Sequence, residues 1–76
     1  MRRRMGFENL SEMDRKLYEY IKQRDFETYP WSTAQAARYL GVTEQDVYES
    51  LARLAKEIPD NIWIHYKDGA IRVSAE

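Results

Sequence analysis

Apolar residues recur at helical spacing in two stretches of the chain. The first stretch predicts a helix over about residues 12–24. Its apolar face includes Leu10, which lies just before the helix, together with Met13, Leu17, Tyr20 and Ile21. In the second stretch a single stripe at spacings i, i+4, i+7 and i+11 is formed by Val47, Leu51, Leu54 and Ile58. A stripe at a period of about 3.6 residues is typical of a helix with one buried side. The pattern therefore predicts two amphipathic helices.

Short polar patterns mark where helices begin. At three places a Ser or Thr is followed, three residues later, by a side chain that can complete a capping box. The pairs are Ser11 with Asp14, Ser32 with Gln35, and Thr43 with Asp46. Between the last two patterns, Gly41 can take the left-handed conformation that ends a helix and turns the chain sharply. Residues 33–58 therefore predict two helices joined by a tight corner, a helix-turn-helix.

The C-terminal residues predict a β-hairpin. Asp68 and Gly69 are a strong signal for a two-residue turn, because a type I′ turn needs positive φ at both central positions. This turn places Tyr66 opposite Ile71 and so sets the register of both strands. One face then carries Ile62, Ile64, Tyr66, Ile71, Val73 and Ala75, and the other carries Trp63, His65, Lys67, Arg72 and Ser74. The turn and the alternation of apolar residues agree.

Two further segments have weaker signals. Pro30 blocks helix formation and favours extended backbone before it, so a short strand is expected near residues 29–31. Residues 1–9 carry Arg2, Arg3 and Arg4 with no helical or strand period, and we expect a flexible basic arm there. Such an arm is either a solvated tail or a segment that lies along nucleic-acid phosphates.

Composition excludes several classes of function. The chain has 76 residues, no cysteine and one histidine, His65, so neither a disulfide framework nor a zinc finger is expected, and an enzyme triad is not expected either. No apolar run has the length of a membrane span or of a signal peptide, so we expect a cytoplasmic protein of one domain. One-third charged residues, two Asn and no Cys are similar to thermophile composition.

The order helix, short strand, helix, turn, helix and hairpin resembles the winged-helix family, in which the hairpin is the wing. The spacing of Ala37, Gly41 and Val47 is similar to that of the small residue, turn glycine and buried aliphatic of helix-turn-helix proteins. The resemblance implies a small α+β winged-helix domain over residues 10–76, after the basic arm of residues 1–9.

The resemblance also implies sequence-specific binding to double-stranded DNA, as in a transcriptional regulator, with no cofactor and no metal. The base-reading residues would be Gln45, Tyr48, Glu49 and Arg53. The residues on the DNA backbone would be Thr43, Lys56, Lys67 and Arg72, together with Arg2, Arg3 and Arg4 of the arm. Many winged helices bind DNA as dimers, so a homodimer is implied as well.

Charge supports an alternative function. Residues 44–57 hold four acids against two bases, and residues 6–76 hold 13 acids against nine bases. Because neutralised phosphates supply most non-specific DNA affinity, an acidic reading helix weakens the DNA interpretation. The alternative is a protein-interaction module on the same fold, in which the acidic helix and exposed aromatic residues bind a basic protein partner.

Three side chains have two interpretations each. Trp63 on the outer hairpin face is either covered by a neighbouring segment or exposed as a contact surface. Tyr48 either packs at the edge of the core or contacts DNA. His65 is expected to be a cross-strand neighbour of Arg72 rather than a ligand.

Overall fold

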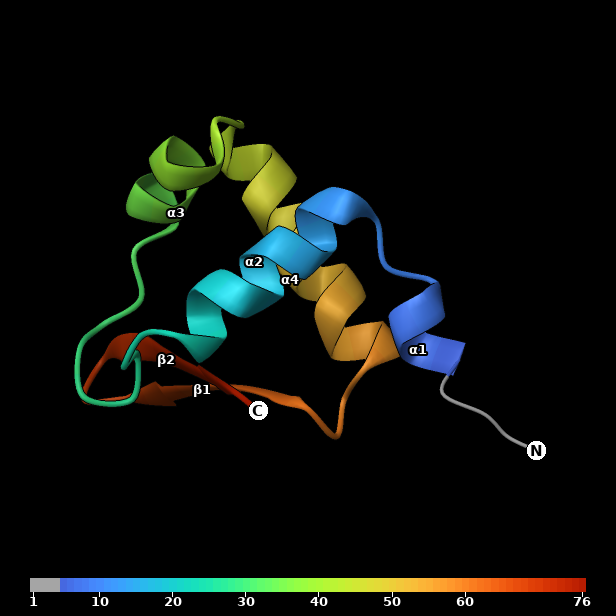
Figure 1. The fold of residues 1–76 in the computed structure, drawn as a ribbon. Helices are drawn as coiled ribbons and strands as arrows, with labels where there is room; N and C mark the ends of the chain where they lie inside the picture. Colours follow the sequence, from blue (N-terminus) through green and yellow to red (C-terminus); the bar gives the residue numbers. More distant parts are fainter. Residues whose placement is uncertain (1–4) are drawn as a thin grey trace.

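A computed structural model describes residues 5–76 of the chain. These residues form, in order, α1 (Met5–Glu8), α2 (Glu12–Lys22), α3 (Thr33–Leu40), α4 (Glu44–Glu57), β1 (Ile62–Lys67) and β2 (Ala70–Ala75). Helices α2 and α4 cross each other and contact the β1–β2 hairpin beneath them, while α3 packs against both helices at their other end (Figure 1). The fold is a small α+β arrangement with three longer helices and an antiparallel hairpin, as expected from the sequence.

Capping boxes begin α2 and α4 as predicted. The Ser11 hydroxyl accepts a hydrogen bond from the Asp14 amide, and the Asp14 carboxylate accepts one from the Ser11 amide, each at 3.1 Å. Thr43 and Asp46 make the same two contacts at 3.0 and 3.2 Å. These bonds satisfy amides that have no partner within the helix, so each start is determined locally.

The corner between α3 and α4 depends on Gly41. Its φ of 72° lies in the left-handed region, and its amide donates to the Ala37 carbonyl, as does the next amide, Val42 N, at 3.0 Å. At the other end of α3, the Ser32 hydroxyl accepts from the Gln35 amide at 3.2 Å. The predicted helix-turn-helix geometry is therefore present, and the buried Ala37 leaves room for α4 to approach.

The hairpin has the predicted register at every position. Asp68 and Gly69 have φ values of 55° and 80°, as a type I′ turn requires. The partners are Ile62 with Ala75, Trp63 with Ser74, Ile64 with Val73, His65 with Arg72, Tyr66 with Ile71 and Lys67 with Ala70. The predicted apolar face is only partly covered, however. Ile62 and Val73 are buried, whereas Ile64 is 43% exposed and Tyr66 is 77% exposed.

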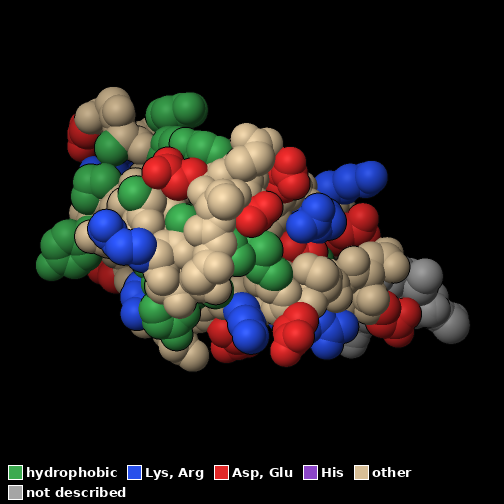
Figure 2. Space-filling view, turned by 90° about the horizontal axis from the view of Figure 1, so that it is seen from above, with side chains coloured by type: hydrophobic (Ala, Val, Ile, Leu, Met, Phe, Trp, Pro, Cys, Tyr) green, Lys and Arg blue, Asp and Glu red, His purple; other side chains and the backbone are tan. Residues whose placement is uncertain are grey.

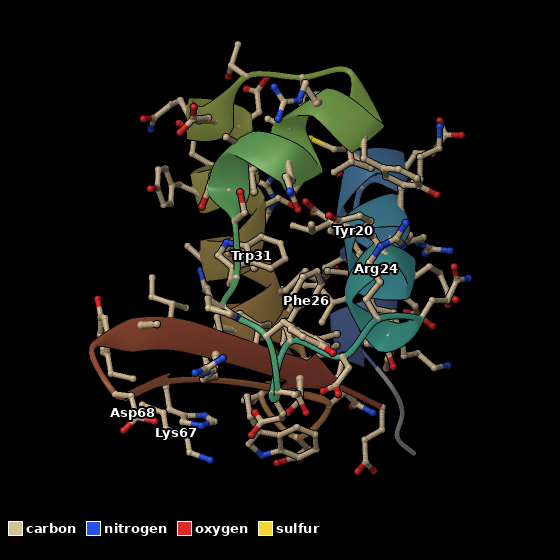
Figure 3. The ribbon with its side chains drawn as sticks, turned by 90° about the vertical axis from the view of Figure 1, so that its left-hand side faces the viewer. Tyr20, Arg24, Phe26, Trp31, Lys67 and Asp68 are labelled. Carbon is tan, nitrogen blue, oxygen red and sulfur yellow. The ribbon has the colours of Figure 1, made fainter. Side chains whose placement is uncertain are left out.

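The strand expected at residues 29–31 is not formed. Instead the loop between α2 and α3 touches the free edge of β2 at two points, where Val73 N donates to Phe26 O at 3.3 Å and Trp31 N donates to Ile71 O at 3.0 Å. A regular ladder advances both strands equally, but these contacts are five residues apart on the loop and two apart on β2. The residues between them bulge away, and Tyr29 among them is 66% exposed. Phe26 and Trp31 are buried between the helices and the hairpin (Figure 3).

The N-terminal residues also differ from the expected arm. Met5–Glu8 is helical, and the Phe7 ring packs edge-on against Tyr18 with centroids 5.5 Å apart. The Asn9 side chain donates to the Glu57 carboxylate at 3.0 Å. The aromatic contact was missed because a single turn is too short to show a period. Arg2, Arg3 and Arg4 lie outside the described residues.

Candidate nucleic-acid interface

The exposed side of α4 is set by its buried stripe. Val47, Leu51, Leu54 and Ile58 are all buried, as predicted, and the contacts they make rotate the opposite side of the helix towards solvent. Side chains on that opposite side are exposed, and they are Gln45, Tyr48, Glu49, Ala52 and Lys56. Three of the four predicted base-reading residues, Gln45, Tyr48 and Glu49, therefore lie together on one accessible surface, which we call the α4 outer face.

The α4 outer face is mainly polar and carries one basic side chain, Lys56. Gln45 Nε2 donates to Glu49 Oε2 at 3.1 Å, one helical turn apart. This contact holds both ends of the pair against the helix surface. Tyr48 is 52% exposed, so it does not pack into the core edge. The face thus presents an amide and a phenol, which both donate and accept hydrogen bonds, and a carboxylate, which only accepts them.

Arg53, the fourth predicted base-reading residue, makes a contact inside the domain. Its Nε donates to Asp14 Oδ2 at 2.8 Å and its Nη2 donates to Asp14 Oδ1 at 3.0 Å, a two-pronged ion pair between α4 and α2. Ser50 Oγ also donates to Asp14 Oδ1. Asp14 and Ser50 have no exposed surface. Two of the five N–H donors of Arg53 are therefore used inside the domain, while its side chain stays 44% exposed.

The environment of Asp14 keeps it charged. Burial disfavours the charged form and by itself raises the pKa of Asp14. Hydrogen bonds from Arg53, Ser50 and the Ser11 amide outweigh burial and lower the carboxyl pKa from 3.8 to about 2. Sequence reasoning assigned Asp14 to the capping box alone. Its spacing of three and seven residues from Leu17 and Ile21 was the signal that it also faces the core.

Arg72, which the sequence assigned to the DNA backbone, is also bonded inside the domain. Its Nη1 donates to the Thr28 carbonyl at 2.9 Å, and its Nε is buried without a hydrogen-bond partner among the described residues. His65, directly opposite on β1, lies 3.6 Å from the Glu27 carboxylate. The outer face of the hairpin therefore receives the α2–α3 loop, and one nitrogen of Arg72 is bonded to that loop. Trp63 on the same face is 42% exposed.

The remaining predicted backbone residues are accessible. Thr43, Lys56 and Lys67 are exposed, and no ion pair involves either lysine within residues 5–76. Lys67 lies at the tip of the hairpin, away from the aromatic cluster beneath α3 (Figure 3). Seen from above, however, Lys and Arg side chains lie in several separate places among Asp, Glu and uncharged side chains, so this face has no continuous basic stripe (Figure 2).

A cluster that the sequence analysis did not identify joins α2 to α3. The Tyr20 and Tyr39 rings lie 4.8 Å apart, and the Arg24 guanidinium lies 4.2 Å from the first centroid and 5.0 Å from the second. Tyr20 also contacts the Phe26 and Trp31 rings. A cation above aromatic faces is attracted by the ring quadrupole. Arg24 therefore helps to fix α3 in place, and with it the corner that orients α4.

Comparisons with protein-family models, curated proteins and solved structures gave no match to this chain. Within residues 5–76, no cluster of three or more His, Cys, Asp or Glu side chains is arranged to hold a metal ion. In the same residues no helix has both the length and the apolar character needed to cross a membrane.

Proposed function

We propose that the protein is a winged-helix domain that binds double-stranded DNA, as a transcriptional regulator does, with α4 in the major groove and the β1–β2 hairpin on the backbone. The observation that carries the proposal is the α3–Gly41–α4 corner, which leaves one complete side of α4 uncovered beside a hairpin. A single helix presented in this way fits the width of the major groove.

The residue roles follow from the accessible donors and acceptors. Gln45 can pair with adenine through its amide, and Glu49 can accept from the amino group of cytosine, while Tyr48 contacts bases or sugar beside them. Lys56 and Lys67 bind phosphates, and Thr43 donates its hydroxyl hydrogen to one. The three arginines Arg2, Arg3 and Arg4 add phosphate contacts from the N-terminus. Arg53 and Arg72 have no reading or phosphate role in this proposal.

Because α4 is acidic, we expect the affinity of the protein for DNA to depend strongly on Arg2, Arg3 and Arg4. Helix α4 carries four acids and two bases, and one of those bases, Arg53, is neutralised by Asp14. Each neutralised phosphate contributes about −0.9 to the slope of log affinity against log salt. With Lys56, Lys67 and three arginines in contact, we expect a slope of roughly −4 to −5.

Binding to random-sequence duplex at several salt concentrations, followed by fluorescence anisotropy, tests the proposal. Lys67→Ala should flatten the slope by about one and weaken binding to all sequences alike. Lys16→Ala, which removes an exposed lysine from the outer side of α2, is the matched control and should leave the slope unchanged. Affinity no tighter than about millimolar at low salt, with all three arginines present, would refute DNA binding.

The exposed Tyr48 beside the Glu49 carboxylate favours a second candidate, binding of a basic protein partner through the α4 outer face. Glu49→Gln separates the two functions. On DNA the loss of a negative charge relieves repulsion and should strengthen non-specific binding. At an interface with a basic protein the same change removes an attraction and should weaken binding.

A further inference from the structure

Strand β1 is an open edge of the sheet. Its partner on one side is β2, and the far side of β2 is met by the α2–α3 loop at Phe26 and Trp31. Within residues 5–76, no backbone hydrogen bond joins the other side of β1 to any segment. A strand with an unpaired side presents a row of amides and carbonyls that another strand can use.

The register identifies which backbone groups point outward. Val73 N and Ile71 O are bonded to the loop, so these two residues direct their amides and carbonyls away from β1. In an antiparallel pair, residues opposite one another either exchange both hydrogen bonds or direct both sets of groups away from each other. Ile64 and Tyr66, which lie opposite Val73 and Ile71, therefore direct their amides and carbonyls to the open edge.

The side chains at these same two positions are the uncovered part of the apolar face. Ile64 and Tyr66 are both exposed, although they lie on the face that buries Ile62 and Val73 against the helices. Protein edges are commonly protected by charge or proline, but β1 has neither at these positions, and its one fully charged residue, Lys67, is next to the turn. The unpaired backbone and the uncovered apolar side chains coincide.

We propose that a second copy of this chain occupies the edge, with the two β1 strands paired antiparallel about a two-fold axis at His65. In this register Ile64 lies opposite Tyr66 of the other copy in both halves, so each pair exchanges two backbone hydrogen bonds and the exposed apolar side chains cover one another. On the outer face, Trp63 lies opposite Lys67 of the other copy, a cation and an aromatic ring. The contact is isologous and closes the edge of both copies.

The register is favoured over one closer to the start of β1. Ile62 is already buried beneath α4, so a strand placed beside it would bring the helices of both copies close together. Pairing through the tip half of β1 uses only the exposed residues and keeps the helical layers apart. Because few side chains take part, the interface belongs to the smaller and weaker class, and the dimer should be strongly dependent on concentration.

Amide hydrogen exchange on the full chain without DNA tests the proposal directly. The amides of Ile64 and Tyr66 should exchange rapidly in dilute protein and become protected by tenfold or more as the concentration rises. The amides of His65 and Lys67, which are bonded to β2, should be protected at both concentrations and serve as controls in the same strand. Sedimentation over the same range should show a monomer becoming a dimer.

Variants test the location of the contact. Ile64→Lys places two ammonium groups on the paired edge and should abolish the dimer, whereas Tyr29→Lys, at an exposed residue away from the edge, should not. His65→Cys introduces the only thiol of a cysteine-free chain on the two-fold axis, where paired Cα atoms about 4.5 Å apart allow a disulfide. The His65→Cys variant should form a disulfide-linked dimer much faster than the Tyr29→Cys variant. This comparison tests the location of the contact even if Ile64→Lys unfolds the chain.

A chain that stays monomeric at about millimolar concentration overturns the proposal, since even weak specific interfaces form dimers there. So does a dimer in which Ile64 and Tyr66 remain unprotected, or one in which His65→Cys cross-links no faster than the control, because either result places the contact elsewhere. None of these outcomes depends on DNA, so failure of the dimer and failure of DNA binding are distinguishable.

Discussion

Replacing Asp14 by Asn removes the charge from the buried contact between α2 and α4 while preserving the shape of the side chain. Asp14 Oδ1 accepts from Ser50 Oγ and Arg53 Nη2, and Oδ2 accepts from the Ser11 amide and Arg53 Nε. An Asn amide group has one acceptor oxygen and one donor nitrogen. In either orientation its nitrogen therefore faces an N–H of Arg53, and a hydrogen bond is replaced by a clash of donors.

The magnitude follows from the lowered pKa of Asp14. A fall from 3.8 to about 2 corresponds to roughly 2.5 kcal/mol of stability at neutral pH, because one pKa unit is worth about 1.4 kcal/mol. The hydrogen bonds from Arg53, Ser50 and the Ser11 amide cause this lowering, so their loss is already included in the figure. Arg53 is 44% exposed and can turn to water, which limits the cost of leaving it unpaired. We expect Asp14→Asn to lower the free energy of unfolding by about 2 to 3 kcal/mol at pH 7, a large share for so small a domain.

The pH dependence provides the assay. A carboxyl whose pKa is lowered by folding contributes stability that is complete above its unfolded pKa, here 3.8, and that is lost as pH falls towards about 2. Urea unfolding of the parent chain and of Asp14→Asn should therefore differ by the full amount from about pH 5 upwards and by much less near pH 2. Asp60→Asn, at an exposed turn residue, is the control for charge alone. A difference between Asp14→Asn and the parent that is the same at both ends of this range would refute the reasoning.

Other residues give simpler expectations. Leu51→Ala should destabilise the domain by about 2 to 5 kcal/mol, whereas Gln45→Ala on the opposite side of α4 should cost less than about 0.5 kcal/mol, as thermal unfolding would reveal. The reverse ranking would mean that α4 is rotated from its observed position. Gly69→Val should cost about 1 to 2 kcal/mol because Gly69 has a φ of 80°, and an unchanged melting temperature would contradict the type I′ turn. Thr43→Ala removes the acceptor for the Asp46 amide and should cost about 1 kcal/mol in urea unfolding.

Local chemistry explains why so much of the fold was predictable. The capping residues Ser11 and Thr43, the left-handed Gly41 and the Asp68–Gly69 turn each act within a few residues of chain, so their effects can be read without knowing the rest of the fold. The hairpin register follows from the turn by counting. The strand expected near Pro30 failed for the opposite reason. Whether an extended segment pairs regularly depends on how the whole loop crosses β2, which is a property of the tertiary structure.

The candidate site was less predictable, because the sequence does not show which charged side chains are used internally. Arg53 and Arg72 look on the chain like free cations on the exposed sides of a helix and a strand. In the structure, Arg53 binds the buried Asp14 and Arg72 binds the carbonyl of Thr28. Both contacts join segments 39 and 44 residues apart in sequence, a separation that no local pattern encodes.

The same two arginines decide how charge should be counted at the proposed DNA surface. A net charge summed over α4 counts Arg53 as an attraction for phosphate, although the buried carboxylate of Asp14, 2.8 Å from Arg53 Nε, already compensates its charge. Without Arg53, the basic residue on the α4 outer face is Lys56, about two helical turns from Glu49. Under the proposed function, most of the long-range attraction to a duplex then comes from Lys67 and from Arg2, Arg3 and Arg4. Under the proposed function, the α4 outer face discriminates between bases through Gln45, Tyr48 and Glu49, and most of the affinity for DNA depends on residues outside α4, which itself supplies only Lys56.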